Sequence, residues 1–312
     1  MGHKRVSYSR GCAMKAVLLH GYGGVDQLVY EEVPIPIAAA GEVLVKLFAT
    51  SINPIDYKIR RGEMKDYIPL QFPAILGYDL AGQVVALGQG VTGVKVDALV
   101  LALAERTYAE YVTCKAVGLS HMPDGLKPIE AGVLPLVLLT GTQLIELGVR
   151  PRSGERVLIT GALGSVGRTA VHIAQKHGAY VIAGVRASQR AEAKKLGVDE
   201  VVAVDEDLAD LKELDAVADI VGRDVIDRLI PHIRKNGVLA TVVGAPKSAA
   251  GRDVQVHEVW SVPDPHRLEE LAQEIASGEF AIPIAKRFTL AEIRQAHVLA
   301  EKGAAGKVLL TP

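Results

Sequence analysis

A glycine-rich segment near the middle of the chain has residue types and a spacing suited to binding phosphate. Gly161–Gly167 reads Gly-Ala-Leu-Gly-Ser-Val-Gly and lies between an apolar run and a helical pattern. A helix that begins here directs unpaired N–H groups and its positive dipole end toward a ligand, and small residues let a pyrophosphate approach the backbone. The alternative is a tight turn that needs glycine for its geometry alone. The segment predicts a dinucleotide site with Ala162 in place of the first fingerprint glycine. Its predicted members are Ala162, Gly164, Ser165, Val166 and Gly167.

The end of the next apolar run indicates which dinucleotide binds. An NAD site usually has an acidic residue about 20 positions after the glycine turn, where it holds the ribose hydroxyls. Here Gly184 stands instead, and Arg186, Ser188 and Arg190 follow it. Guanidinium groups suit a phosphate dianion, so the segment favours NADPH. The alternative is that both arginines are solvated charges at a strand end.

Two other segments concentrate polar side chains among turn residues. They are Asn53–Lys58, which reads Asn-Pro-Ile-Asp-Tyr-Lys, and Gly77–Gly82, which reads Gly-Tyr-Asp-Leu-Ala-Gly. We expect these segments to form the walls of a cleft. No nucleophile motif is apparent, and the nine histidines lack ligand spacing, so the sequence gives hydrolysis little support.

Hydrophobic patterning predicts the elements that position these segments. From Met14 to about Val117, short alternating strands broken by Gly and Pro indicate a twisted β-rich body. Between Glu155 and Val243 the runs become continuously apolar, as expected for a parallel sheet covered by helices. The predicted strands are 157–159, 181–183, 201–204, 216–221 and 238–243. After Phe280 we expect a strand, a helix over 290–301 and a final strand at 307–310.

A chain of 312 residues is longer than one core usually serves, so two domains are expected. A formal net charge of −1 without a long basic run excludes nucleic acid as a favoured partner. The polar start and the short apolar stretches predict no membrane association and a cytoplasmic location. Two cysteines without a C-x-x-C pair predict neither a disulfide framework nor a structural zinc site.

At this point the chain resembles the medium-chain dehydrogenase/reductase superfamily, and within it the zinc-free quinone oxidoreductase and enone reductase branch. The resemblance covers residues 14–312 and is specific as a set. Its marks, besides the glycine turn, are Met14-Lys15-Ala16, Asn53-Pro54-Ile55-Asp56, the 77–82 segment, Tyr108-Ala109-Glu110-Tyr111, Leu134-Pro135-Leu136 and Gly306-Lys307-Val308-Leu309-Leu310.

The resemblance implies an α/β fold that pairs a β-rich GroES-like catalytic domain with a doubly wound Rossmann domain. The expected division is 1–13 as an extension, 14–133 as catalytic domain, 134–279 as NADPH-binding domain and 280–312 returning to the catalytic domain. NADPH and substrate are expected to meet at the junction. Homodimerisation through an edge strand near 254–259 is a further expectation.

The chain departs from the zinc-dependent alcohol dehydrogenases of that superfamily. Asn53 and Tyr78 stand where those enzymes place a cysteine and a histidine on catalytic zinc, and the cysteine-rich structural zinc lobe is absent. The resemblance therefore implies a metal-free enzyme. Around 97–107 the glycine-rich approach to Tyr108 is shortened, and Arg106 takes a glycine's place.

Without a Lewis acid, the expected reaction is hydride transfer from NADPH to a small conjugated carbonyl, either a quinone or an enone, whose negative charge spreads into an enolate. The predicted catalytic donors are Asn53, Lys58 and Tyr78, and the predicted pocket residues are Tyr57 and Tyr67. Further cofactor contacts are expected from Thr140, Val221, Val243, Gly244 and Lys307. Each has a structural alternative: Asp56 and Asp79 as turn caps, Tyr78 as core, Lys58 as a surface charge, Thr140 bonded to its own helix, and Lys307 neutralising an acid.

Two rival functions remain open. A catalytically idle NADPH-binding protein would keep the glycine turn, because the turn indicates binding and not turnover. A zinc-dependent alcohol dehydrogenase would contain stoichiometric metal.

Overall fold

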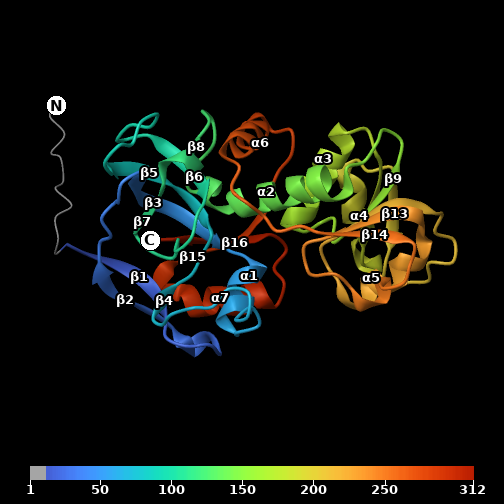
Figure 1. Ribbon diagram of the computed structural model, residues 1–312, viewed down its shortest axis with the longest axis horizontal. Coiled ribbons are helices and arrows are strands. Elements are labelled where there is room, and N and C mark those ends of the chain that lie inside the picture. The colour runs from blue at the N-terminus through green and yellow to red at the C-terminus, as the bar shows by residue number, and fades with distance from the viewer. Residues whose placement is uncertain (1–11) are drawn as a thin grey trace. The chain divides into compact units, whose positions relative to one another are not determined.

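The computed structural model describes residues 12–312, and the chain divides into two compact units (Figure 1). The first unit comprises the chain up to Leu136 together with Pro263–Pro312, and the second is Val137–Val262. The N-terminal unit therefore includes the C-terminal end of the chain. Of the predicted extension at 1–13, residues 1–11 lie outside the described residues. The first strand begins at Ala13, within the predicted extension.

The first unit is built from two sheets. A three-stranded sheet has the order β2-β1-β4, and a seven-stranded one has the order β15-β16-β3-β5-β6-β8, with β7 also paired to β3. Their strands are β1 (Ala13–Leu19), β2 (Leu28–Pro34), β3 (Glu42–Ile52), β4 (Ala74–Ile75), β5 (Asp79–Leu87), β6 (Leu99–Leu103), β7 (Tyr111–Lys115), β8 (Ser120–His121), β15 (Ile284–Thr289) and β16 (Lys307–Thr311). The helices are α1 (Pro54–Arg60), α6 (Pro265–Ser277) and α7 (Ile293–Glu301).

Strand pairing at the chain end positions the polar segments of this unit. β16 runs antiparallel to β3, with Val308 opposite Ile52 and Leu310 opposite Thr50. Most residues of both strands are buried, so burial specifies their register. This pairing brings Lys307 next to the residues that follow β3.

The second unit holds the predicted parallel sheet. Its six strands run in the order β11-β10-β9-β12-β13-β14, and every neighbouring pair is parallel. Helices α3 and α5 lie on opposite sides of the strands in Figure 1, which is the doubly wound arrangement. The strands are β9 (Arg156–Thr160), β10 (Tyr180–Val185), β11 (Glu200–Ala203), β12 (Leu214–Asp219), β13 (Ile233–Thr241) and β14 (Val254–Glu258). The helices are α2 (Pro135–Gln143), which starts in the first unit, α3 (Ser165–Lys176), α4 (Arg190–Ala193) and α5 (Arg223–Leu229).

The unit boundaries differ somewhat from the expected domain boundaries. The expected changes were at 133/134 and 279/280, and the units change at 136/137 and 262/263. The second difference arises from α6, which contacts β6 and β8 of the first unit. Its amphipathic pattern gave no sign of which sheet it would cover, because any apolar helix face can pack on either domain. Within residues 12–312 no helix combines the length and the apolar character that crossing a bilayer requires.

Arg106 occupies a backbone conformation that favours glycine, with φ of 62°. A side chain in this left-handed region crowds its own carbonyl, which costs about 1 kcal/mol. We expect Arg106→Gly to raise the free energy of unfolding by about 1 kcal/mol, measured by urea denaturation. Arg106→Ala keeps the Cβ atom and is the control. Equal stabilisation by both variants would show that the arginine side chain, and not the backbone, carries the cost.

Candidate functional site

The glycine turn of the second unit forms a tight connection between β9 and α3. Gly161 has φ of 61°, and its carbonyl oxygen accepts a hydrogen bond of 2.8 Å from the Gly164 N–H. A Cβ on Gly167 would lie 2.2 Å from the Gly161 oxygen and 2.8 Å from Ala162 Cα, so only glycine fits there. Gly164 is the N-cap of α3, and no side chain caps this helix. The first N–H groups of α3 are thus available to an anion.

The carboxyl ends of the parallel strands bring most of the other predicted cofactor residues to one edge of this sheet. Gly184 lies near the end of β10, and its oxygen accepts from the Ala162 N–H at 3.4 Å. A Cβ on Gly161 would lie 3.1 Å from the Val221 side chain, and one on Gly222 would lie 2.9 Å from the Val243 side chain. The turn is therefore flanked by the ends of β10 and β12, with Val243 and Gly244 following β13 on the far side. In α-β sheets of this kind, ligands bind at this edge.

Asp219 organises these strand ends and was missed in the sequence analysis. Its buried carboxylate accepts hydrogen bonds from the hydroxyls of Thr160 on β9 and Thr241 on β13, at 2.9 and 3.1 Å. It also accepts from the backbone N–H of Val221 and Gly222. A lone acid inside the apolar run 216–221 was the available signal, because a buried charge needs such donors.

The predicted phosphate-binding residues lie on the surface after β10. Arg186, Ser188 and Arg190 are all exposed. Arg190 already forms an ion pair of 2.5 Å with Glu206, whereas Arg186 forms no ion pair within residues 12–312. The free guanidinium of Arg186 is thus the stronger candidate for a phosphate contact.

Thr140 on α2 carries a buried hydroxyl that has no hydrogen-bond partner among residues 12–312. The alternative of a bond to its own helix is therefore not observed. Gly141 next to it packs closely on α3, where a Cβ would lie 2.6 Å from Thr169 Cβ. An orphaned buried hydroxyl on a helix packed against α3 is a suitable group for a ligand contact.

In the first unit, Asn53 lies fully buried between two opposite charges. Its Nδ2 donates to Asp79 Oδ2 at 2.7 Å, and its Oδ1 accepts from Lys307 Nζ at 2.5 Å. Lys307 Nζ also donates to the Ile52 oxygen and lies 3.6 Å from Asp79 Oδ2. Burial lowers the pKa of Lys307, and Asp79 partly offsets this. Two roles were left open for Lys307, a cofactor contact and the neutralisation of an acid. Its ammonium group lies where it neutralises Asp79.

The two acids of this unit do more than cap turns. Asp79 also accepts from the Ser51 hydroxyl and from the Leu136 N–H, the latter at 2.7 Å. Asp56 Oδ2 accepts from the Asn53 N–H at 2.8 Å and from the Tyr108 hydroxyl at 2.7 Å. Complete burial raises the pKa of Asp56 to about 7 against these hydrogen bonds, which lower it.

The remaining predicted substrate residues are more accessible. Tyr57, Lys58 and Tyr78 are partly exposed, and both tyrosines pack on the core formed by β1, β3 and α7. Burial raises the pKa of Tyr78, so its hydroxyl keeps its proton at neutral pH. Tyr67 is 74% exposed in the loop after α1. The hydroxyl of Tyr78 and the ammonium of Lys58 are among the partly exposed groups here that can donate to a ligand.

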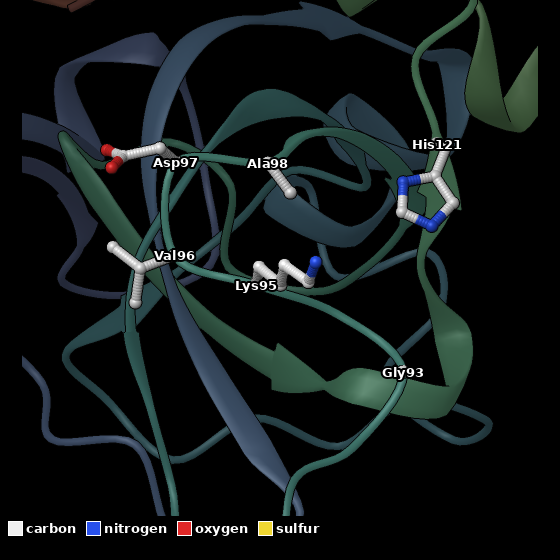
Figure 2. A pocket seen from close by; sticks show the side chains of 6 residues that line it. All are labelled: Gly93, Lys95, Val96, Asp97, Ala98 and His121. Atoms are coloured by element: carbon white, nitrogen blue, oxygen red, sulfur yellow. The ribbon is translucent and has the colours of Figure 1, made fainter.

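A separate hollow of about 470 Å³ in the first unit includes none of the predicted site residues. It is lined by Gly93, Lys95, Val96, Asp97, Ala98 and His121. In Figure 2 the carboxylate of Asp97 lies on the side away from His121. The hollow offers an ammonium and an imidazole group but no buried polar cluster comparable to that around Asn53.

Comparison with known proteins shows which family the chain belongs to. Residues 39–124 match the alcohol dehydrogenase GroES-like domain, and residues 196–310 match the zinc-binding dehydrogenase domain. A chloroplast envelope quinone oxidoreductase homolog of Arabidopsis thaliana is 29% identical over 97% of this chain and 99% of its own. A 2-methylene-furan-3-one reductase of Solanum lycopersicum is 30% identical over 96% of this chain and 79% of its own. This chain belongs to the medium-chain dehydrogenase/reductase superfamily, in its quinone oxidoreductase branch.

The structure of a quinone oxidoreductase from Coxiella burnetii is similar to this protein. The similarity covers 96% of this chain and 100% of the Coxiella chain. The two share 28% sequence identity with a TM-score of 0.86. The predicted fold class, a GroES-like domain with a Rossmann domain, is thereby confirmed. As a member of the superfamily, the protein is an oxidoreductase with a nicotinamide cofactor and a small-molecule substrate.

Proposed function

We propose that this protein is a zinc-independent, NADPH-dependent reductase of small conjugated carbonyl compounds. The observation that carries the proposal is the glycine turn before α3. Its uncapped helix N-terminus presents free N–H groups, and the close approach of Gly167 to the backbone of Gly161 and Ala162 keeps the turn tight, which suits a dinucleotide pyrophosphate. The Thr140 hydroxyl and the strand ends at Val221 and Val243 would complete the nicotinamide side of the site. When bound, NADPH supplies the hydride.

Cofactor choice in this proposal depends mainly on Arg186. Its unpaired guanidinium can bind the 2′-phosphate of NADPH, while Arg190 is partly neutralised by Glu206. We expect Arg186→Ala to weaken NADPH binding about 10- to 100-fold, because a hydrogen bond to a charged group is lost, and to leave NADH binding nearly unchanged. Fluorescence titration of both cofactors measures this. Equal losses for NADPH and NADH would remove Arg186 from the phosphate site.

Zinc independence is supported by the chemistry around Asn53. The side-chain oxygen of Asn53 is already bonded to the ammonium of Lys307, and a nearby cation opposes a second one. A protonated Tyr78 at the other position is a poor zinc ligand. We expect purified protein to contain well below one zinc per chain by elemental analysis and to keep its activity after chelation. Stoichiometric zinc, with activity lost on its removal, would favour the alcohol dehydrogenase reaction instead.

The remaining donors favour a conjugated acceptor. A hydrogen bond from Tyr78 or Lys58 can stabilise the negative charge that develops on a carbonyl oxygen. Asn53 has no direct donor role in this proposal, because its buried amide is held by Asp79 and Lys307. Without a Lewis acid, spreading the negative charge into an enolate or a hydroquinone anion lowers the barrier. The relative from Solanum lycopersicum is named for a compound with a methylene group conjugated to a ketone, and the Arabidopsis one for quinones.

Anaerobic NADPH oxidation against matched quinones, enones and saturated aldehydes tests this function. We expect turnover with quinone or enone and at least 100-fold lower kcat/KM with the aldehyde. Faster reduction of the aldehyde would contradict the mechanism. Tight NADPH binding without turnover of any acceptor would favour the idle binding protein.

Two further expectations concern assembly and location. β14 is an edge strand of the parallel sheet, with β13 as its one partner among the described residues. Pairing of two such edges is the proposed route to a homodimer, and sedimentation of the purified protein tests it. A cytoplasmic location remains part of the proposal.

A further inference from the structure

We propose that Lys307 and Asp79 are positioning residues of the reaction, which clamp Asn53 and thereby fix helix α1 with Tyr57 and Lys58. This inference rests on the proposed function, in which Lys58 is one of the two candidate donors to the acceptor and Tyr57 is a predicted pocket residue. It gives a role to the buried charges of Lys307 and Asp79, which contact neither the acceptor nor the cofactor in the proposed function.

The clamp joins three segments that are distant in the sequence. Asn53 follows β3, Asp79 begins β5 and Lys307 begins β16, and each of the three residues is at most 5% exposed. The Asn53 oxygen accepts from an ammonium group, and its nitrogen donates to a carboxylate. A flipped amide would set N–H against ammonium and oxygen against carboxylate. The two charges therefore allow the amide a single orientation.

The orientation of Asn53 determines where α1 begins. Asn53 is the N-cap residue, its N–H donates to Asp56 Oδ2, and its carbonyl oxygen accepts from the Asp56 N–H at 3.0 Å. Because α1 has only seven residues, it cannot hold its own conformation without tertiary anchors. Tyr57 and Lys58 lie within its first five residues. Loss of the clamp should therefore loosen the helix that carries the proposed substrate contacts.

The charges also explain why the clamp needs both partners. Lys307 without Asp79, or Asp79 without Lys307, would be a buried charge lacking its counter-ion. Asp79 additionally receives the Leu136 N–H in the first turn of α2, so the same carboxylate anchors a fourth segment. Lys307 contacts fewer segments than Asp79 and is the better residue to replace.

Lys307→Met is the test variant, and Lys307→Arg, which restores a charged donor, is the rescue. We expect the methionine variant to lower kcat with an enone or quinone about 10- to 100-fold while the Kd for NADPH changes less than about threefold. Amide hydrogen exchange over residues 53–61 should become about 10-fold faster in Lys307→Met and return toward the wild-type rate in Lys307→Arg. If Lys307 contributed only to global stability, its replacement would speed amide exchange throughout the protein and not only over residues 53–61.

Val112→Ala is the matched control, because Val112 is buried on β7 in a different core of the same unit. It should lower stability without changing kcat or the exchange of 53–61. Wild-type kcat and exchange in Lys307→Met, or the same losses in Val112→Ala, would overturn the proposal. If the wild-type protein reduces no acceptor, the proposed function fails, and normal exchange of 53–61 in Lys307→Met would then reject the clamp separately.

Discussion

Replacing His297 with leucine is expected to stabilise the protein by roughly 3 kcal/mol more at pH 4 than at pH 7. His297 lies fully buried on α7, with no hydrogen-bond partner for either ring nitrogen among residues 12–312. Burial, aided by the charge of Arg60, lowers its pKa from 6.5 to about 3. Between these values the unfolded chain binds a proton that the folded one does not. The stability contributed by the neutral imidazole is thus present above pH 6.5 and is lost as the pH falls toward 3.

Asp56 titrates in the opposite sense, in the same core. Its pKa rises from 3.8 to about 7 on folding, so the folded state binds the extra proton. Its contribution is present below pH 3.8 and is lost as the pH rises through 7. The two effects offset each other between about pH 4 and 6.5. Asp56→Asn, which keeps an acceptor for Tyr108, should therefore gain roughly 3 kcal/mol relative to wild type between pH 4 and pH 7.

Urea denaturation of both variants at pH 4 and pH 7 measures these differences. Leu290→Ala removes a buried side chain from the same core but carries no proton, so its loss should be equal at both pH values. If His297→Leu changes the free energy of unfolding by the same amount at pH 4 and at pH 7, the imidazole takes up its proton in the folded state and the prediction is wrong.

Gly167→Ala is expected to abolish measurable NADPH binding and to lower the free energy of unfolding by about 2 kcal/mol. The added methyl group would lie 2.2 Å from the Gly161 oxygen and 2.9 Å from the Ala162 carbonyl carbon. Both neighbours are backbone, so the turn itself must move. Since the same turn presents the first N–H groups of α3, the phosphate site moves with it. Titration calorimetry with NADPH and thermal unfolding measure the two effects.

Gly164→Ala separates crowding within the turn from crowding of the ligand. Its Cβ would contact only the Gly161 oxygen, at 3.2 Å, so the fold should tolerate it while the phosphate meets an added methyl group. Gly118→Ala is the neutral control, because nothing lies within 4 Å of its Cβ position. Wild-type NADPH affinity in Gly167→Ala would remove the turn from the binding site.

The strands of the second unit could be predicted well from the sequence. The runs at 157–159 and 181–183 became β9 and β10 with an extension of one or two residues at each end, because strands buried on both faces leave a continuous apolar signal. The helix expected over 290–301 is a 3-10 turn followed by α7. The glycine turn was placed correctly between β9 and α3, because the turn itself requires glycine, for the positive φ of Gly161 and the close backbone contact at Gly167.

The buried polar contacts could not be predicted. Lys307 and Asn53 are 254 residues apart, and only the pairing of β16 with β3 brings them together. The resemblance indicated two roles for Lys307 without deciding between them. His297 left no signal, because a histidine on an amphipathic helix is equally compatible with the surface. Local patterns thus specified the elements, and long-range strand pairing determined the polar cluster.

The most direct test of the proposed function is the position of the transferred hydride. The protein is incubated with an enone and NADPH that carries two deuterium atoms at the nicotinamide C4 position, and the product is examined by NMR and mass spectrometry. The proposed function predicts one deuterium at the carbon β to the carbonyl group of a saturated ketone. Deuterium at the carbinol carbon of an allylic alcohol would contradict it.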